Sequence, residues 1–349
     1  MKDEKVMKKS SLLAMTAVAA MAALGLSGCA ADSTSTRACV ILPDADSGTR
    51  WEPGDRPALE SALKDAGYEA DIQNAGSDTT KYATIGDQQL SKGCGVMLLV
   101  DYQGAGVSVA AKAKEQGVPV IAYDRPIEGA DYYVSFDNEV VGQLQGQMIL
   151  DGLAAAGKDP ATASVIFSSG DPADGNAAMF LKGATDVLDA AGVTAAFTME
   201  GTWDGAKAGT LFEQAFTAVD GKVDAVLAPN DNNAASIIAI LDKNGLTVPV
   251  SGQDASVAGL QNVLLGKQWA TVYKPFKVEA KAAADLAIKI LKGEKPTFDK
   301  KNNGVPFLAL DPIATTADLV KDVVAAGDAK AAELCVGDVA AKCTEFGVN

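Results

Sequence analysis

The sequence predicts an α/β fold of two Rossmann-like lobes, each built on a doubly wound parallel sheet with helices on both faces. Short apolar segments alternate with amphipathic segments from residue 37 onward, and such alternation is typical of parallel sheets joined by crossover helices. The alternation runs in two series of similar length, which indicates two similar lobes with a cleft between them. In addition, one apolar segment after another ends in polar residues, and ligands of open α/β sheets bind at that end of the strands.

The first series is expected to form the first sheet. One of its helices shows the pattern clearly, because Leu59, Leu63 and Ala66 share a helical face and Gly67 follows them as a stop residue. In chain order the predicted elements are strand 38–42, helix 56–67, strand 69–73, helix 80–92, strand 96–100, helix 107–116, strand 118–123 and strand 132–136.

The second series begins with a long helix and repeats the alternation. A final helix, 276–292, follows Lys274-Pro275. The 349 residues are enough for two lobes with cores of their own. In chain order the predicted elements are helix 138–156, strand 162–168, helix 177–191, strand 195–200, helix 205–219, strand 225–228, helix 233–244, strand 248–252, helix 257–265 and strand 270–273.

The strand that ends at Tyr123 runs into Asp124, Arg125 and Pro126. A strand cannot continue through a proline, so Asp124 and Arg125 are expected at its carboxyl end. A carboxylate accepts hydrogen bonds and a guanidinium donates them in a rigid fork, which suits a pair of neighbouring hydroxyl groups. The alternative is a solvated salt bridge on a turn.

Other strands end in the same way, and their polar residues are candidates for the same site. They are Arg50 with Trp51, Asn230, Asp254 and Lys274. For Asp124, Arg125, Asp254 and Lys274 the alternative role is a structural ion pair. For Asn230 it is capping of the helix that begins near Asn233.

Composition excludes several classes of function. The chain contains no histidine, which removes Ser-His-Asp and Cys-His catalysis and histidine-based zinc sites. It also lacks a Gly-x-Ser-x-Gly elbow, a phosphate loop and a dinucleotide fingerprint. We therefore expect no enzyme activity, no cofactor and no metal. The net charge of −15 argues against nucleic acid as a partner.

Residues 1–28 are predicted to be a lipoprotein signal peptide. Lys8 and Lys9 precede an apolar run of about 15 residues, too short for a comfortable membrane span. The run ends in Leu26-Ser27-Gly28-Cys29, which resembles a bacterial lipobox. The alternative is a plain signal peptide with an accidental cysteine, and translation starts at either Met1 or Met7.

Lipidation of Cys29 would anchor the protein at the outer face of the cell membrane. Residues 29–36 have the composition of a linker between that anchor and the folded part. A diacylated cysteine supplies the multiple chains that stable anchoring needs. The lipid is the only membrane attachment that we expect.

The four remaining cysteines form an even set in an exported chain, which favours disulfides. Cys39 lies early in the first strand and Cys94 just before the third, and strands one and three are neighbours in the sheet order 2-1-3. Cys335 and Cys343 are close in sequence. We predict the pairs Cys39–Cys94 and Cys335–Cys343; the alternative is free buried thiols.

Eight short motifs occur in order between residues 37 and 313, and together they resemble the periplasmic sugar-binding proteins of ABC importers, of the ribose, galactose and xylose class. Within that class the chain is most similar to the xylose binders. The motifs are Arg50-Trp51, Ala122-Tyr123-Asp124-Arg125, Ser135-Phe136-Asp137-Asn138, Asp174-Gly175-Asn176-Ala177, Pro229-Asn230-Asp231, Ser251-Gly252-Gln253-Asp254-Ala255, Thr271-Val272-Tyr273-Lys274-Pro275, and Asn302-Asn303-Gly304 before Leu310-Asp311-Pro312-Ile313.

The resemblance implies the type I periplasmic binding protein fold, with two lobes joined by a three-strand hinge. The three crossovers would fall near Asp137-Asn138, Pro275-Phe276 and Gly304-Val305. The N-terminal lobe would then be 37–137 plus 276–304, and the C-terminal lobe 138–275 plus 305–349.

The resemblance also implies the sugar contacts. They are Arg50, Asp124 and Arg125 from the first lobe, Asp174, Asn176, Asn230, Asp254 and Lys274 from the second, and Trp51 and Trp203 as stacking indoles. We expect the two indoles to sandwich the sugar ring. Two departures concern this picture: the segment between Asn176 and Trp203 is shorter than in the xylose binders, and the end of the chain carries an unexpected cysteine pair.

The function that the resemblance implies is capture of a monosaccharide and its delivery to an ABC permease. The protein would act as a monomer. D-xylose leads the ligands, with arabinose, glucose and galactose as alternatives. A different class of function also remains open, in which the same protein is a sugar sensor that docks on a signalling partner.

Overall fold

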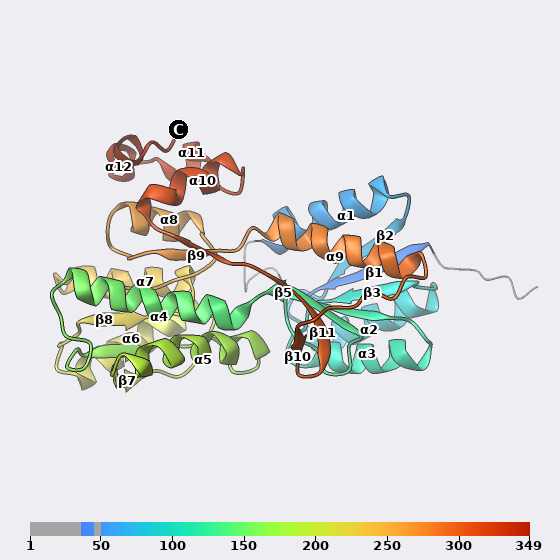
Figure 1. Cartoon of the computed structure of the whole chain (residues 1–349), viewed down its shortest axis with the longest axis horizontal. Helices are drawn as coiled ribbons and strands as arrows, with labels where there is room; N and C mark the ends of the chain where they lie inside the picture. The colour runs from blue at the N-terminus through green and yellow to red at the C-terminus, as the bar shows by residue number, and fades with distance from the viewer. Residues whose placement is uncertain (1–35, 45–49) are drawn as a thin grey trace, which may run out of the picture. The chain divides into compact units, whose positions relative to one another are not determined.

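The computed structural model describes residues 36–44 and 50–349 (Figure 1). The predicted signal peptide, Cys29 and almost all of the predicted linker lie outside the described residues. Within the described ranges, no helix is both long enough and apolar enough to cross a membrane.

The first lobe is built on a seven-stranded sheet in the order β10-β11-β5-β4-β3-β1-β2. Its strands are parallel except β10, which pairs antiparallel with β11. Strand β1 lies between β2 and β3, so the predicted 2-1-3 order is confirmed. The bounds are β1 Arg37–Leu42, β2 Glu69–Asn74, β3 Val96–Leu99, β4 Val120–Tyr123, β5 Tyr132–Phe136, β10 Lys301–Asn302 and β11 Val305–Leu310.

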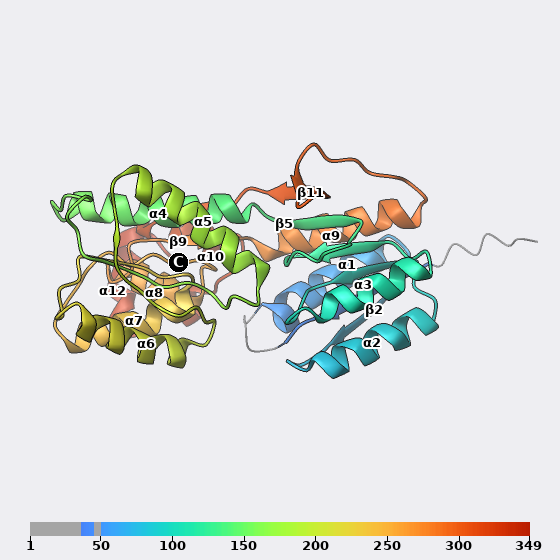
Figure 2. The ribbon, with the colours of Figure 1, turned by 90° about the horizontal axis from the view of Figure 1, so that it is seen from below.

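Helices cover both faces of this sheet, because successive strand residues point to opposite sides. Val40 and Leu42 pack with α1 (Arg56–Asp65) and α9 (Phe276–Leu291). Cys39 and Ile41 pack with α2 (Thr79–Ser91) and α3 (Ala105–Glu115) on the other face. Figures 1 and 2 show the two layers of helices. The described part of the loop after β1 continues into a π-helical turn, η1 (Trp51–Asp55).

The second lobe contains a parallel sheet in the order β7-β6-β8. The predicted strand 248–252 does not form as a strand. Val250 forms a single bridge to Val226, and Gln253 forms a single bridge to Val272 of β9. Pro249 has no N–H, so it cannot donate the hydrogen bond that would extend the pairing with Val226 into a strand. The bounds are α4 Asn138–Ala155, β6 Val165–Phe167, α5 Gly175–Ala190, β7 Ala195–Thr198, α6 Gly205–Ala218, β8 Ala225–Leu227, α7 Asp231–Lys243, α8 Val257–Leu264, β9 Thr271–Tyr273 and β12 Ile313–Thr315.

The third crossover lies later than the sequence predicted. Strand β11 pairs with β5, with Phe307 opposite Tyr133 and Leu310 opposite Phe136. Residues 305–310 therefore belong to the first sheet, and the boundary at 304 was wrong. The chain leaves this sheet after Leu310, whose carbonyl accepts a 2.8 Å hydrogen bond from the amide of Asp137 at the first crossover. The continuous apolar run 305–310 places β11 between β10 and β5, a position that the motif pattern did not reveal.

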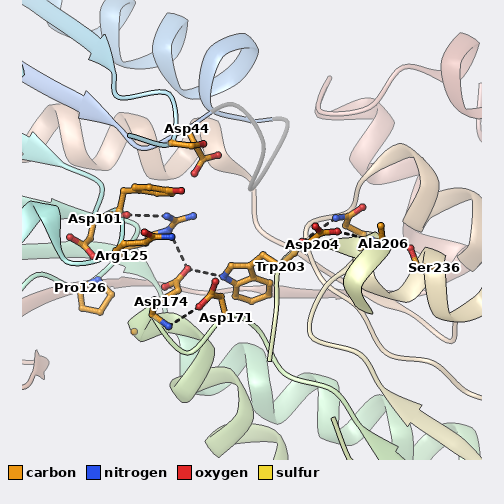
Figure 3. A pocket seen from close by; sticks show the side chains of 17 residues that line it. Asp44, Asp101, Arg125, Pro126, Asp171, Asp174, Trp203, Asp204, Ala206 and Ser236 are labelled. Atoms are coloured by element: carbon orange, nitrogen blue, oxygen red, sulfur yellow. Dashed lines mark hydrogen bonds and ion pairs between the residues drawn. The ribbon is translucent and has the colours of Figure 1, made fainter. Parts of the chain in front are cut away.

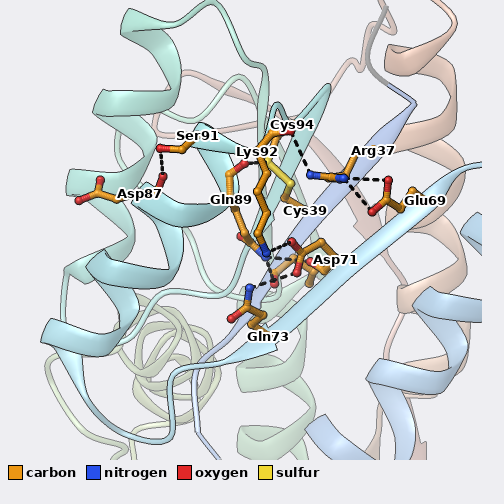
Figure 4. Close-up of a disulfide and its surroundings, with 11 residues drawn as sticks. Arg37, Cys39, Glu69, Asp71, Gln73, Asp87, Gln89, Ser91, Lys92 and Cys94 are labelled. Carbon is orange, nitrogen blue, oxygen red and sulfur yellow. Dashed lines mark hydrogen bonds and ion pairs between the residues drawn. A yellow bond between two sulfur atoms is a disulfide. The ribbon is translucent and has the colours of Figure 1, made fainter.

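Both predicted disulfides are present in the structure. Cys39 and Cys94 have Cα atoms 5.8 Å apart, and their bond joins β1 to the residues before β3 (Figure 4). Cys335 and Cys343, also 5.8 Å apart between Cα atoms, close a short loop near the end of the chain.

The residues after β12 form short helices that pack against α8. Leu334, Val339 and Cys343 share an apolar cluster there with Leu260 and Val263. The sequence predicted none of these helices. Their bounds are η2 Ala317–Leu319, α10 Val320–Ala325, α11 Ala331–Leu334 and α12 Val339–Phe346.

Candidate functional site

A cavity of about 630 Å³ is lined by residues of both lobes (Figure 3). Of the predicted site residues, Arg125, Asp174 and Trp203 line it. The remaining predicted residues, Arg50, Trp51, Asp124, Asn176, Asn230, Asp254 and Lys274, do not belong to its lining. The structure thus places part of the predicted set on the wall of one cavity, and the rest forms contacts that support or adjoin that wall.

An ion pair connects the two lobes at this cavity. The Nε atom of Arg125 lies 3.2 Å from Oδ2 of Asp174, and the indole N–H of Trp203 donates to the same oxygen at 3.2 Å. Arg125 also donates through Nη1 to the carbonyl of Asp101 at 2.9 Å. Burial raises the pKa of Asp174, even though Arg125 and the hydrogen bonds from the Asn176 amide and the Trp203 indole oppose the shift. A donor, an acceptor and an aromatic face therefore meet at one point of the wall.

Asp174 and Asn176 owe their places to the start of α5. Asp174 is the N-cap, and its Oδ1 accepts from the amide of Asn176 at 2.9 Å. Asn176 is nearly buried and reaches across to the first lobe, where its Nδ2 donates to the carbonyl of Asp124 at 3.0 Å. Its Oδ1 accepts from Asn138 at 2.9 Å. The predicted pair therefore lies in one network, but Asn176 is behind the wall.

Asp124 directly follows β4 and lies in the left-handed backbone region, with φ at 64°, which a non-glycine residue rarely adopts. Its Oδ2 accepts from Arg50 at 2.8 Å, and its carbonyl accepts from the hydroxyl of Tyr133 at 3.0 Å. Burial disfavours the charged form of Asp124, but Arg50, Lys274 and Arg125 outweigh it and lower the pKa. Asp124 is therefore an ionised acceptor held in a fixed orientation.

Trp51 lies in the apolar core of the first lobe rather than on the cavity wall. It is 3% exposed, and the guanidinium carbons of Arg50 and Arg125 lie 4.6 and 5.7 Å from its ring centre. Such distances are those of cation–π contacts. The indole therefore packs against both guanidinium groups, and Arg125 also lines the cavity.

Trp203 occupies the place predicted for it in the second lobe. A Cβ on Gly170 would lie 2.2 Å from the indole, so the ring lies directly against that backbone. Phe180 contacts it edge-on, with ring centres 6.4 Å apart. The remaining indole surface borders the cavity.

Lys274 and Asp254 form the ion pair that was their alternative role. Lys274 Nζ lies 3.0 Å from Asp254 Oδ1, with side-chain exposures of 11% and 43%. The ammonium also lies 5.3 Å from the ring centre of Phe180. Because almost half of the Asp254 side chain is exposed, its carboxylate retains room to accept further hydrogen bonds.

Asn230 adopts its alternative role as well. Its Oδ1 accepts from the amide of Asn233 at 2.9 Å and caps α7. The neighbouring Asp231 is buried and accepts from Gln268 and Thr271, each at 2.8 Å. Burial raises the pKa of Asp231 to about 7.

Some residues in and around the cavity were not among the predicted site residues. Asp101 and Tyr102 line the cavity. They lie just after strand β3, separated from it by Val100, so the pattern that selected Asp124, a polar residue at the carboxyl end of a strand, would have found them. Glu279 of α9 and Asp55 of η1 contact Arg50. Neither follows a strand. Glu279 is 229 residues from Arg50 in the chain, and Asp55, only five residues away, belongs to a turn that no sequence pattern indicated.

Comparison with known families matches residues 39–295 to a periplasmic binding protein domain. The D-xylose-binding periplasmic protein of Escherichia coli (strain K12) is 35% identical over 290 residues, which cover 79% of this chain and 85% of that protein. The multiple sugar-binding periplasmic receptor ChvE of Rhizobium radiobacter is 29% identical over 347 residues, covering 91% of this chain and 97% of the relative.

A solved structure shares the fold. It is an ABC transporter solute-binding protein from Clostridium phytofermentans with bound β-D-glucose, with a TM-score of 0.76 and 30% identity, covering 85% of this chain and 99% of that one. The predicted type I fold is thereby confirmed. The family match, the 35% identity and the two sheets with their shared cavity agree, and we conclude that the chain belongs to the periplasmic binding protein family, among the sugar-binding proteins of ABC transport.

Proposed function

We propose that the protein is a non-enzymatic receptor that captures a monosaccharide between its lobes and delivers it, as a monomer, to an ABC permease. D-xylose is the first candidate, because two relatives at 35% identity are named as D-xylose-binding proteins. The observation that carries the proposal is the meeting of Arg125, Asp174 and Trp203 at one point of the cavity.

This constellation suits a neutral sugar. Hydroxyl groups both donate and accept, so a carboxylate and a guanidinium can hold neighbouring hydroxyls, while the C–H face of a sugar ring lies on an indole. A micromolar ligand needs only about −8 kcal/mol of binding free energy, which a few charge-assisted hydrogen bonds and one aromatic contact supply.

The charge of the wall favours neutral over anionic sugars. Among the described lining residues, Arg125 is accompanied by five carboxylates, from Asp44, Asp101, Asp171, Asp174 and Asp204. A sugar acid or sugar phosphate would face repulsion at such a surface.

The remaining predicted residues have proposed roles in the same site. Asp124, Arg50 and Asp254 would accept or donate to sugar hydroxyls once the lobes adjust around the ligand, and Lys274, Asn176, Asn230 and Trp51 would hold the surrounding groups. Their contacts with one another, described above, support this proposal because they join residues from strand ends of both lobes.

We expect D-xylose to raise the melting temperature of residues 37–349 more than L-arabinose, D-glucose or D-galactose does. A ligand that binds only the folded state stabilises it by about 2.7 kcal/mol at 100 times its dissociation constant. Thermal-shift measurement with each sugar checks this expectation. A larger shift with glucose would overturn the choice of xylose, and no shift with any sugar would overturn the proposed function.

We further propose that Cys29 is lipidated and that the mature protein is anchored outside the cytoplasm. The lipobox-like Leu26-Ser27-Gly28-Cys29 after a short apolar run supports this. A Cys29→Ala variant is expected to appear in the medium or as uncleaved precursor, with Ser33→Ala in the predicted linker as the control. Cell fractionation and mass spectrometry check it; unchanged mature mass and membrane association in Cys29→Ala would contradict the anchor.

A further inference from the structure

A cluster of buried charges surrounds Arg50 in the first lobe. The guanidinium donates to Asp55 at 2.6 and 2.9 Å, to Glu279 at 2.7 Å and to Asp124 at 2.8 Å. The side chains of Asp55 and Glu279 are fully buried, while those of Arg50 and Asp124 retain slight exposure. One arginine thus connects a proposed sugar acceptor, Asp124, to two acids that have no access to the ligand.

Glu279 has a particular place in the chain. It lies in the first turn of α9, after the crossover near Pro275-Phe276 that leads from β9 to this helix. Its Oε2 accepts from Arg50, and its Oε1 is buried with no hydrogen-bond partner among the described residues. A buried carboxylate oxygen without a partner is costly, whereas a protonated oxygen costs much less.

The charges around Glu279 point to the same protonation state. The titratable groups that face it are Arg50, Asp55, Tyr123, Asp124 and Tyr133. Three carboxylates share the guanidinium of Arg50, so full ionisation would leave excess negative charge in the core. Burial raises the pKa of Glu279 to about 8, while that of Asp124 is lowered. Burial also raises the pKa of Asp55, but both of its carboxylate oxygens accept hydrogen bonds, whereas Oε1 of Glu279 accepts none among the described residues. We therefore place the proton on Glu279, which leaves Asp124 ionised.

We propose that Glu279 is a positioning residue for the sugar site: it holds Arg50 in the orientation that presents the Asp124 carboxylate, although it does not touch the ligand. The inference rests on the proposed function and adds a residue to it. Asp55 holds Arg50 from the other side, and the hydroxyl of Tyr123 donates to Asp55. Because Glu279 lies in the first turn of α9, the helix that follows the crossover also holds Arg50 beside Asp124.

Two substitutions separate positioning from burial. Glu279→Met removes the acceptor but keeps the size, and we expect D-xylose affinity to fall about tenfold or more, since a hydrogen bond to a charged group contributes roughly 1.5–3 kcal/mol. Glu279→Gln imitates the protonated acid and keeps an acceptor for Arg50, so we expect this variant to bind D-xylose with wild-type affinity. Asp285→Asn is the matched control, because Asp285 lies on the same helix and pairs with Lys281 on the surface.

The protonation of Glu279 has its own readout in the absence of sugar. A folded-state pKa raised above the ordinary value means that stability is greatest at low pH and is lost as pH rises through the folded pKa. The melting temperature of the wild type is therefore expected to fall between about pH 5 and pH 8. Glu279→Gln should remove part of this decline. Asp231, Asp174 and Asp55, whose pKa values are also raised, account for the slope that remains in both proteins.

The outcomes distinguish this inference from the proposed function. If the wild type binds sugar and Glu279→Met binds it equally well, the positioning role is overturned. If the wild type binds no sugar, the proposed function fails, and the Nε–H resonance of Arg50, assigned with Arg50→Lys, decides the positioning role. That resonance should be sharp in wild type and Glu279→Gln and exchange-broadened in Glu279→Met; an unchanged resonance in Glu279→Met would overturn the inference.

Discussion

Replacing Arg125 with methionine is expected to weaken sugar binding by about 100-fold or more. Arg125 is the cation on the described cavity wall, and its guanidinium connects Asp101 of the first lobe with Asp174 of the second. Two charge-assisted hydrogen bonds to sugar hydroxyls would account for roughly 3 kcal/mol. In the variant, Asp174 would also lose its cationic partner and keep only the hydrogen bonds from Trp203 and the Asn176 amide. Titration calorimetry with D-xylose measures the effect.

Arg125→Lys tests the geometry of the contact rather than its charge. Lysine keeps the charge but lacks the planar fork, so we expect an intermediate loss of about tenfold. Arg56→Met is the control, because Arg56 pairs with Glu52 near the surface. If Arg125→Met binds as tightly as the wild type, the inter-lobe ion pair is structural and the assignment of this point as the sugar contact is wrong.

The sequence predicted much of the fold because the apolar periodicity is strong where helices and strands are long. Every strand from β1 to β9 and every helix from α1 to α9 begins and ends within a few residues of its expected place. Two failures have physical causes. Pro249 interrupts the ladder of the expected strand 248–252, and β11 joins the first sheet only through pairing with β5, which is a long-range contact that local patterns do not encode.

The site was harder to predict than the fold. Its first candidates were chosen by one rule, which selects polar residues that follow the carboxyl end of a predicted strand. The rule finds residues such as Arg125 that follow a strand and face the cleft, and it would also have found Asp101. It cannot tell an exposed strand end from a buried one, so it made the buried Trp51 a site candidate, and the family resemblance then gave Trp51 the same stacking role as Trp203. It also cannot find Glu279, which reaches Arg50 from a helix 229 residues away in the chain.

Trp203→Ala is expected to weaken sugar binding by about 30- to 100-fold with little change in the stability of the free protein. The indole borders the cavity and lies on Gly170, so part of its area is available to the apolar face of a sugar ring. Burial of that area contributes about 2–3 kcal/mol. Its N–H also donates to Asp174, and loss of this bond would loosen the acceptor. Titration calorimetry of the wild type and Trp203→Ala with D-xylose checks the affinity, and thermal melting of the two proteins without sugar checks the stability.

Trp51→Ala gives the contrasting result that decides how the sugar ring is held. Because Trp51 is buried beneath Arg50 and Arg125, its truncation should lower the free energy of unfolding by about 3–5 kcal/mol. Trp51→Phe keeps a ring under the arginines and should recover most of that stability. In the proposed arrangement Trp203 would stack on one face of the sugar, and polar groups of the first lobe would contact the other. If Trp51→Phe instead binds sugar as poorly as Trp203→Ala while remaining fully stable, both indoles contact the ligand, and the two-sided sandwich is correct.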